Sequence, residues 1–309
     1  MISLEPVSLA QRTGPSQTRV YGLVCLMTLI WSLNYVVAKV ALRSFPPVFF
    51  ACLRMLLAGA MMTVVYAVWI RRRPTAAIQK WPWRDLLLVA AVGVLGMVGN
   101  QVFFVVGIGR TSVAHASLVI ATTPVQVLML AWLRRQEHLT RLKFAGMALA
   151  VGGVAVLNLS PGRSARGASI LGDFLVFLCA FSFSVYTVFT KERLRRYGSI
   201  PLNTLGYAVS TLLLIPPVCL WGREFHFAAV PVTGWLTLAY MAGLSSVLCY
   251  MIFAYALGFL PASRVSSFSY AQPLIASLAA WWLLGEPVTL AVAVGGAMVL
   301  AGVWLTSRN

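Results

Sequence analysis

The feature that most constrains this chain is its division into ten apolar runs, each long enough to cross a lipid bilayer. A transmembrane helix needs about 20 predominantly apolar residues. Hydrophobic residues make up 60% of the 309 residues and charged residues 10%, whereas a soluble domain carries about 25% charged residues. Membrane-spanning strands would be about half as long and would alternate polar with apolar residues, so we predict an all-α integral membrane protein. The predicted spans are 20–42, 48–70, 86–108, 113–133, 142–157, 170–190, 202–221, 232–257, 263–284 and 288–306.

The basic residues predict how the chain is oriented. Most of the 24 lysines and arginines fall in segments that are cytoplasmic if the N-terminus is cytoplasmic. Cytoplasmic loops of membrane proteins carry such an excess. We therefore expect a multi-pass protein of the bacterial inner membrane, surrounded by membrane lipid, with both termini in the cytoplasm. Since the basic residues are spread over short loops, the net charge of +17 does not indicate a nucleic-acid partner.

The two halves of the chain repeat one another. The segments "TPVQVLMLAWLRRQEHLTRLKFAGMALAVGG" (123–153) and "QPLIASLAAWWLLGEPVTLAVAVGGAMVLAG" (272–302) share proline, tryptophan, glutamate, threonine and glycine at a constant offset. We predict a cytoplasmic tail (1–19), a first five-helix repeat (20–158), a periplasmic linker (159–169) and a second five-helix repeat (170–309). An odd number of spans in each half inverts the second repeat. Inverted repeats around a central cavity near the midplane are typical of alternating-access transporters, although a duplication kept only for stability is the alternative.

Several motifs resemble a known family. "WSLNYVVAKVAL", "FFACLRMLLAGAMM" and "LGEPVT", together with the glycine-spaced last helix of each half, are similar to the drug/metabolite transporter superfamily and to its EamA-type ten-helix members. This resemblance implies that helices 1–4 and 6–9 surround the central cavity while helices 5 and 10 pack peripherally. It also implies export of metabolites, with the exporters of amino acids, including aromatic ones, nearest.

The chain departs from the four-helix relatives of that superfamily in one respect. Those relatives carry a glutamate in helix 1 that exchanges protons for cationic drugs, and helix 1 has no acidic residue here. All seven acidic residues lie at helix ends, in loops or in the tail. This distribution argues against the export of lipophilic cations.

Polar side chains inside the spans are the candidates for lining the cavity. Helix 1 carries polar residues along one face at helical spacing, and helix 9 carries a second such stripe that includes Pro273. Adjacent amides in helix 3 also need partners at membrane depth. Hydrogen bonding between helices is the alternative for all of them. The candidates are Ser32, Tyr35, Lys39, Asn100, Gln101, Phe104, Tyr186, Tyr250, Ser266, Ser269 and Tyr270.

Two basic residues lie within spans. Lys39 in helix 1 and Arg54 in helix 2 are both in the outer half by depth, where together they would favour a carboxylate. The alternative for Lys39 is a side chain that extends to the membrane surface, and for Arg54 a buried contact with backbone carbonyls.

Two prolines and two glutamates recur in both halves. Pro124 and Pro273 lie within helices 4 and 9, where each is expected to kink its helix and to act either as a hinge or as a static bend. Glu137 and Glu286 come three residues before Thr140 and Thr289, a spacing that suits hydrogen bonding at the start of helices 5 and 10.

No motif points to chemistry. With three histidines and no H-E-x-x-H, G-x-S-x-G or G-K-[ST] pattern, we expect no enzyme activity, no metal and no cofactor. We predict a secondary transporter that exports small metabolites, foremost aromatic or neutral amino acids, by alternating access. The alternatives are a transporter of drugs, sugar phosphates or nucleotide derivatives, and a channel or lipid-handling protein. The partner is then a small-molecule substrate, and no oligomeric state is predicted.

Overall fold

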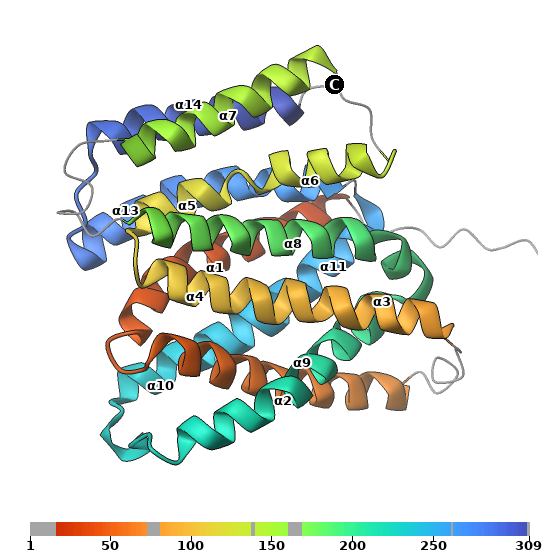
Figure 1. Ribbon diagram of the computed structural model, residues 1–309. Helices are drawn as coiled ribbons and strands as arrows, with labels where there is room; N and C mark the ends of the chain where they lie inside the picture. Colours follow the sequence, from red (N-terminus) through yellow and green to blue (C-terminus); the bar gives the residue numbers. More distant parts are fainter. Residues whose placement is uncertain (1–16, 73–80, 137–139, 160–168, 261, 308–309) are drawn as a thin grey trace, which may run out of the picture.

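The computed structural model describes residues 17–72, 81–136, 140–159, 169–260 and 262–307, and these residues form a bundle of helices without any strand (Figure 1). The first half contains α1 (Gln17–Ala41), α2 (Pro47–Arg72), α3 (Trp83–Gly93), η2 (Val94–Gly99), α4 (Asn100–Ile108), α5 (Val113–Ile120), α6 (Thr123–Leu133) and α7 (Arg141–Leu159). The second half contains α8 (Ile170–Tyr197), α9 (Ser199–Gly222), η4 (Phe227–Ala229), α10 (Val232–Ala239), η5 (Tyr240–Leu248), α11 (Cys249–Phe259), α12 (Ala262–Ser267), η6 (Phe268–Tyr270), α13 (Ala271–Leu284) and α14 (Leu290–Ser307).

The predicted ten-helix membrane fold is confirmed. Seven helical segments are long and apolar enough to cross a bilayer: Gln17–Ala41, Pro47–Arg72, Trp83–Ile108, Val113–Leu133, Ile170–Tyr197, Ser199–Gly222 and Val232–Phe259. The remaining three crossings are α7, the α12–α13 segment and α14. Large apolar side chains such as Trp282 and Leu290 are exposed on the outside of the bundle, as expected where lipid replaces water as the solvent.

The fifth span of each half packs beside its counterpart, outside the other helices. In Figure 1, α7 and α14 lie along one another at the edge of the bundle. Glycines permit this contact, because a Cβ atom built at Gly153 would lie 2.6 Å from the carbonyl oxygen of Gly295. A Cβ atom at Gly302 would lie 2.5 Å from the backbone nitrogen of Ala150. Small residues let membrane helices approach this closely in the absence of a hydrophobic driving force.

Irregular backbone occurs at equivalent places in the two halves. The third and eighth spans each contain a π-helical stretch, η2 and η5. The fourth and ninth spans are interrupted, at Ala121–Thr122 and at η6. Such interruptions are tolerated at membrane depth only where the backbone faces protein or a cavity, and π-helical stretches are frequent at functional sites.

Polar contacts tie the helices together at both ends of the bundle. The two ends of the bundle are named by α1: it begins at the near end and terminates at the far end. At the near end, the Asp85 carboxylate accepts hydrogen bonds from the Tyr197 hydroxyl (2.6 Å) and from Nε of Arg193 (3.2 Å). At the far end, Asp173 on α8 is buried and accepts a hydrogen bond from the Thr111 hydroxyl, while its other oxygen lies 3.0 Å from Nδ1 of His115. The expectation that acidic residues lie at helix ends is met by Asp173, in the first turn of α8, although the residue is buried there.

Glu286 makes a hydrogen bond at a helix start, as predicted, but at a different helix from the predicted one. Its carboxylate does not bind the start of α14; it accepts the backbone N–H of Val113 at the start of α5, 2.8 Å away. The start of α14 is bound instead by the Thr289 hydroxyl, which accepts the N–H of Val292. Gly285, with φ of +67°, ends α13 in a left-handed conformation that turns the chain toward α5. Glu137, the counterpart in the first half, lies outside the described residues, as does most of the predicted linker.

Candidate functional site

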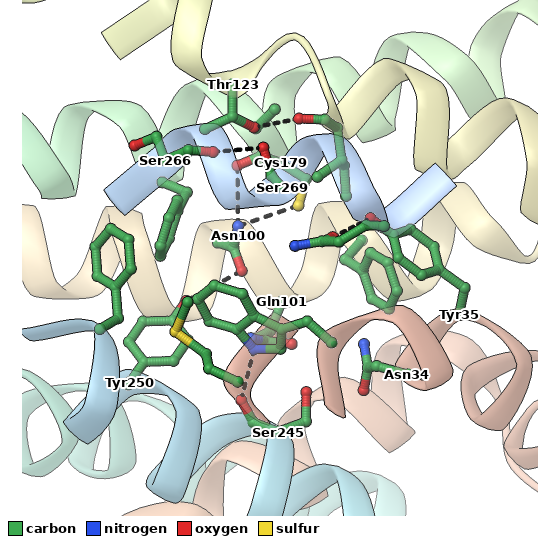
Figure 2. A pocket seen from close by; sticks show the side chains of 18 of the residues that line it. Asn34, Tyr35, Asn100, Gln101, Thr123, Cys179, Ser245, Tyr250, Ser266 and Ser269 are labelled. Carbon is green, nitrogen blue, oxygen red and sulfur yellow. Dashed lines mark hydrogen bonds between the residues drawn. The ribbon is translucent and has the colours of Figure 1, made fainter. Parts of the chain in front are cut away.

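A central pocket opens among the spans that carry the irregular backbone. Its walls come from α1, α2, α4 and the α5–α6 break in the first half, and from α8, η5, α11 and the α12–α13 segment in the second. Figure 2 shows the polar side chains Asn34, Asn100, Thr123, Ser245 and Ser266 arranged around it. The site is therefore built from both repeats.

Among the described residues that line this pocket, Arg54 is the only charged one. The residue is 1% exposed, and its Nε donates to the carbonyl oxygen of Met241 and to Oγ of Ser246, each at 3.0 Å. Nη2 donates to Oγ of Ser245 at 3.2 Å, and Nη1 has no partner among the described residues. Every one of these partners is neutral. A buried guanidinium with a free donor and no carboxylate beside it favours an anionic ligand.

The buried amides of the pocket fall into two groups. Asn100 and Gln272 are bonded: Asn100 Nδ2 donates to the carbonyl oxygen of Cys179 at 2.9 Å, and the Tyr35 hydroxyl donates to Oε1 of Gln272 at 3.0 Å. Within the described residues, Asn34 and Gln101 have no hydrogen-bond partner, and Oδ1 of Asn34 is a buried acceptor without one. Buried polar groups are almost always hydrogen-bonded, so this pair is available to a ligand.

One wall of the pocket is aromatic. Trp31 packs edge-on against Phe183 with ring centroids 5.6 Å apart, and Phe183 in turn lies 4.7 Å from Phe253 and 5.7 Å from Tyr250. The indole Nε1 of Trp31 donates to the carbonyl oxygen of Ser245 at 3.0 Å, which fixes the ring. This wall suits an apolar or aromatic ligand side chain.

A second polar surface lies where the fourth and ninth spans are broken. Thr123, Ser266 and Ser269 line the pocket here, on the opposite side from Ser245 in Figure 2. Ser269 donates to the carbonyl oxygen of Ser266 at 2.7 Å, whereas Oγ of Ser266 has no partner in the described chain. The pocket thus offers hydroxyl groups away from Arg54.

The sequence-predicted residues are distributed between this pocket and the surrounding bundle. Eight of them line it: Tyr35, Arg54, Asn100, Gln101, Phe104, Tyr250, Ser266 and Ser269. The structure places four others outside it. Ser32 donates to the carbonyl oxygen of Thr28, the Tyr186 hydroxyl donates to Oδ1 of Asn203, and Tyr270 is half-buried beside the pocket residues. Lys39 lies at the far end, 4.0 Å from Glu286.

Arg54 occupies both of the positions that the sequence left open, because it both contacts a backbone carbonyl and lines the pocket. The pocket residues that were not predicted from the sequence include Trp31, Asn34, Ser245 and Gln272. A signal existed for three of them, since each is a polar residue inside a span, but Asn34 lies off the stripe of Ser32 and Tyr35.

Both repeated prolines lie just after a break. Pro124 is in the first turn of α6 and Pro273 in the first turn of α13. A proline has no N–H to donate, so the first turn of a helix accommodates it without losing a bond. Among the described residues, no group of three or more metal-ligating side chains could hold a metal ion, and the five cysteines are free.

Comparisons with known proteins agree with this architecture. The model of a family described as the EamA-like transporter family matches residues 18–159 and again residues 170–308. The chain is 28% identical over 284 residues to "Uncharacterized transporter YdfC" of Bacillus subtilis, covering 91% of this chain and 88% of that one. It is 29% identical to the "Probable terminal-alkyne amino-acid exporter" of Streptantibioticus cattleyicolor, and the match covers 94% of this chain and 93% of that one. It is 28% identical to the "Probable amino-acid metabolite efflux pump" of Salmonella typhimurium, and the match covers 92% of this chain and 93% of that one.

A solved crystal structure supports the fold. It is 20% identical to this chain and superposes with a TM-score of 0.64. The match covers 94% of this chain and 96% of the solved chain. At this identity the likeness speaks to the fold alone.

Proposed function

This chain belongs to the EamA-like transporter family, and from that premise we propose that it exports amino acids across the bacterial inner membrane by alternating access. The superfamily that the sequence motifs resembled is thereby confirmed. The substrates we propose are neutral amino acids with an apolar or aromatic side chain. Two relatives are named an amino-acid exporter and an amino-acid metabolite efflux pump, and these names support the substrate class.

The single observation that carries the proposal is the buried Arg54, which lines the pocket and whose Nη1 has no partner among the described residues. A carboxylate bound there would receive a charge-assisted hydrogen bond in a site with few competing waters. The same group would neutralise a buried positive charge that no acidic side chain offsets in the described pocket. The aromatic wall beside Trp31 and Phe183 would receive the apolar side chain of the amino acid.

The other solute classes fit this pocket less well. A lipophilic cation would meet Arg54 with no carboxylate to balance it. A sugar phosphate or nucleotide derivative carries one or more phosphate groups, each of them negatively charged, and proteins usually hold such groups with several basic side chains. The pocket contributes one.

Counterflow in proteoliposomes tests the proposal. Vesicles loaded with an unlabelled amino acid should accumulate labelled L-leucine faster than empty vesicles, and the rate should saturate, since a carrier exchanges one substrate for another. Loading with glucose 6-phosphate or with a cationic dye should give no stimulation. Uptake of labelled glucose 6-phosphate or dye that these solutes stimulate from the other side, together with no uptake of labelled L-leucine, would overturn the proposed substrate class. Uptake of L-leucine without any trans-stimulation would indicate a channel.

A further inference from the structure

We propose that Asn34 binds the ammonium group of the substrate, next to a carboxylate site at Arg54. This inference rests on the proposed function and names a residue that determines specificity within it. It concerns one end of the pocket, where α1, α2 and η5 meet.

Asn34 is a buried amide without a hydrogen-bond partner among the described residues. It lies on α1, is 7% exposed, lines the pocket and leaves Oδ1 unbonded. Asn100 provides the comparison within the same pocket, since its Nδ2 donates to Cys179 and its Oδ1 accepts from the Tyr250 hydroxyl at 3.2 Å. An amide that only braced the bundle would be expected to be bonded as Asn100 is. A ligand is the partner that would account for an unbonded one.

The position of Asn34 relative to Arg54 fits an α-amino acid. Trp31 precedes Asn34 by one helical turn on α1 and donates to the carbonyl oxygen of Ser245. The hydroxyl of that same Ser245 accepts from Nη2 of Arg54. Figure 2 shows Asn34 and Ser245 on the same side of the pocket. The ammonium and carboxylate of an α-amino acid are attached to one carbon, so their binding groups must lie close together. The shared contact with Ser245 places Arg54 and the turn of α1 that carries Trp31 and Asn34 at the same end of the pocket.

An amide is also the right chemical group at this place. An aspartate beside Arg54 would pair with the guanidinium and occupy the donor that the carboxylate needs. The oxygen of a neutral amide accepts hydrogen bonds from an ammonium and leaves Arg54 free. In Figure 2 the amide nitrogen of Asn34 faces the centre of the pocket. A half-turn about the Cβ–Cγ bond presents the oxygen instead, and it breaks no hydrogen bond of the described residues, since neither end of the amide is bonded to any of them.

The ammonium site at Asn34 and the carboxylate site at Arg54 can be tested separately with L-leucine and two analogues, each of which lacks one charged group. L-Leucine carries both charged groups, 4-methylpentanoate lacks the ammonium, and L-leucinamide lacks the carboxylate. Binding to the purified full-length transporter in detergent is measured by titration calorimetry for the wild type, Asn34→Ala, Asn34→Ser and Arg54→Gln.

We expect Asn34→Ala to weaken L-leucine binding about tenfold, the effect of one hydrogen bond to a charged group, and to change 4-methylpentanoate binding less than about twofold. Retained binding of 4-methylpentanoate shows at the same time that the variant is folded. Asn34→Ser keeps an acceptor oxygen and should lose less affinity for L-leucine than Asn34→Ala. Arg54→Gln should weaken both carboxylate ligands.

Two results would overturn the inference and leave the carboxylate site intact. In the first, Asn34→Ala weakens L-leucine and 4-methylpentanoate equally, which would make Asn34 a structural residue or a carboxylate ligand. In the second, the wild type binds 4-methylpentanoate as tightly as L-leucine, which would make the substrate a carboxylate without an ammonium. If the folded wild type binds L-leucinamide but neither carboxylate, the proposed function itself fails.

Discussion

The Lys39 ammonium on α1 lies 4.0 Å from the carboxylate of Glu286, which directly follows α13 and Gly285. The second carboxylate oxygen of Glu286 holds the N–H of Val113 at the start of α5. One acidic residue therefore links the first, fourth and ninth spans at the far end of the bundle. A lysine inside an apolar helix needs a partner or a route to water, and here it has a partner outside the pocket.

Lys39→Ala should therefore leave substrate affinity within about twofold of the wild type and lower the free energy of unfolding by less than about 1 kcal/mol, because a partly exposed ion pair contributes little. Glu286→Ala should cost about 1–3 kcal/mol, since it also leaves the N–H of Val113 without its acceptor. Denaturant titration in detergent measures the free energy of unfolding of both variants. A tenfold loss of affinity in Lys39→Ala would place Lys39 in the substrate path instead.

Arg54→Lys should abolish most carboxylate binding even though the charge is kept. The guanidinium donates to Met241, Ser245 and Ser246 at once and still has Nη1 left over. A lysine ammonium has three donors on one atom, so bonds to these partners leave none for a ligand. We expect L-leucine affinity to fall at least about tenfold, measured by calorimetry. Wild-type affinity in this variant would show that charge alone, without the geometry of arginine, is sufficient.

The near-end contact between α3 and α8 predicts a coupled pair of variants. The Tyr197 hydroxyl donates to Asp85, and the ring of Tyr197 stacks on Trp81 with centroids 3.8 Å apart. Tyr197→Phe keeps the stacking and removes the hydrogen bond to a charged acceptor, so we expect a loss of about 1–2 kcal/mol in the free energy of unfolding. Adding Asp85→Asn to Tyr197→Phe should cost less than Asp85→Asn alone, because the two residues share one interaction. Strictly additive losses would show that the contact contributes nothing.

The sequence predicts the spans well because apolar runs of about 20 residues have few alternatives to a membrane helix. The predicted span 113–133 coincides with Val113–Leu133, and 86–108 falls inside Trp83–Ile108. The apolar pattern of the sequence does not predict the π-helical stretches η2 and η5. Their backbone geometry depends on neighbouring helices that the sequence does not reveal.

The site could be predicted only in part, because a polar stripe identifies one face of a helix and not what that face meets. Ser32 and Tyr35 share a stripe, yet Ser32 bonds back to its own helix and Tyr35 reaches Gln272 on α13. Arg54 was recognisable as a basic residue within a span, but its partners at Met241 and Ser245 come from the other half of the chain. Contacts at such sequence separations follow from tertiary packing alone.

Adjacent glycines on α7 provide a matched test of how that helix meets α14. A Cβ atom at Gly153 would lie 2.6 Å from the backbone oxygen of Gly295, so Gly153→Ala must push the two helices apart. A Cβ atom at Gly152 meets only the end of the Met298 side chain, at 3.4 Å, which can move. We expect Gly153→Ala to lower the free energy of unfolding by about 1–3 kcal/mol. Gly152→Ala should leave it unchanged or raise it slightly, since alanine favours a helix over glycine.

Thermal denaturation of the two purified variants in the same detergent checks this difference. Both change one glycine to alanine in the same helix, so helix propensity and lipophilicity cancel between them. Because none of the described side chains of α7 and α14 lines the pocket, L-leucine affinity at low temperature should stay within about twofold of the wild type in both variants. Equal melting temperatures for the two variants would mean that α7 and α14 do not approach at Gly153 in the membrane protein as isolated.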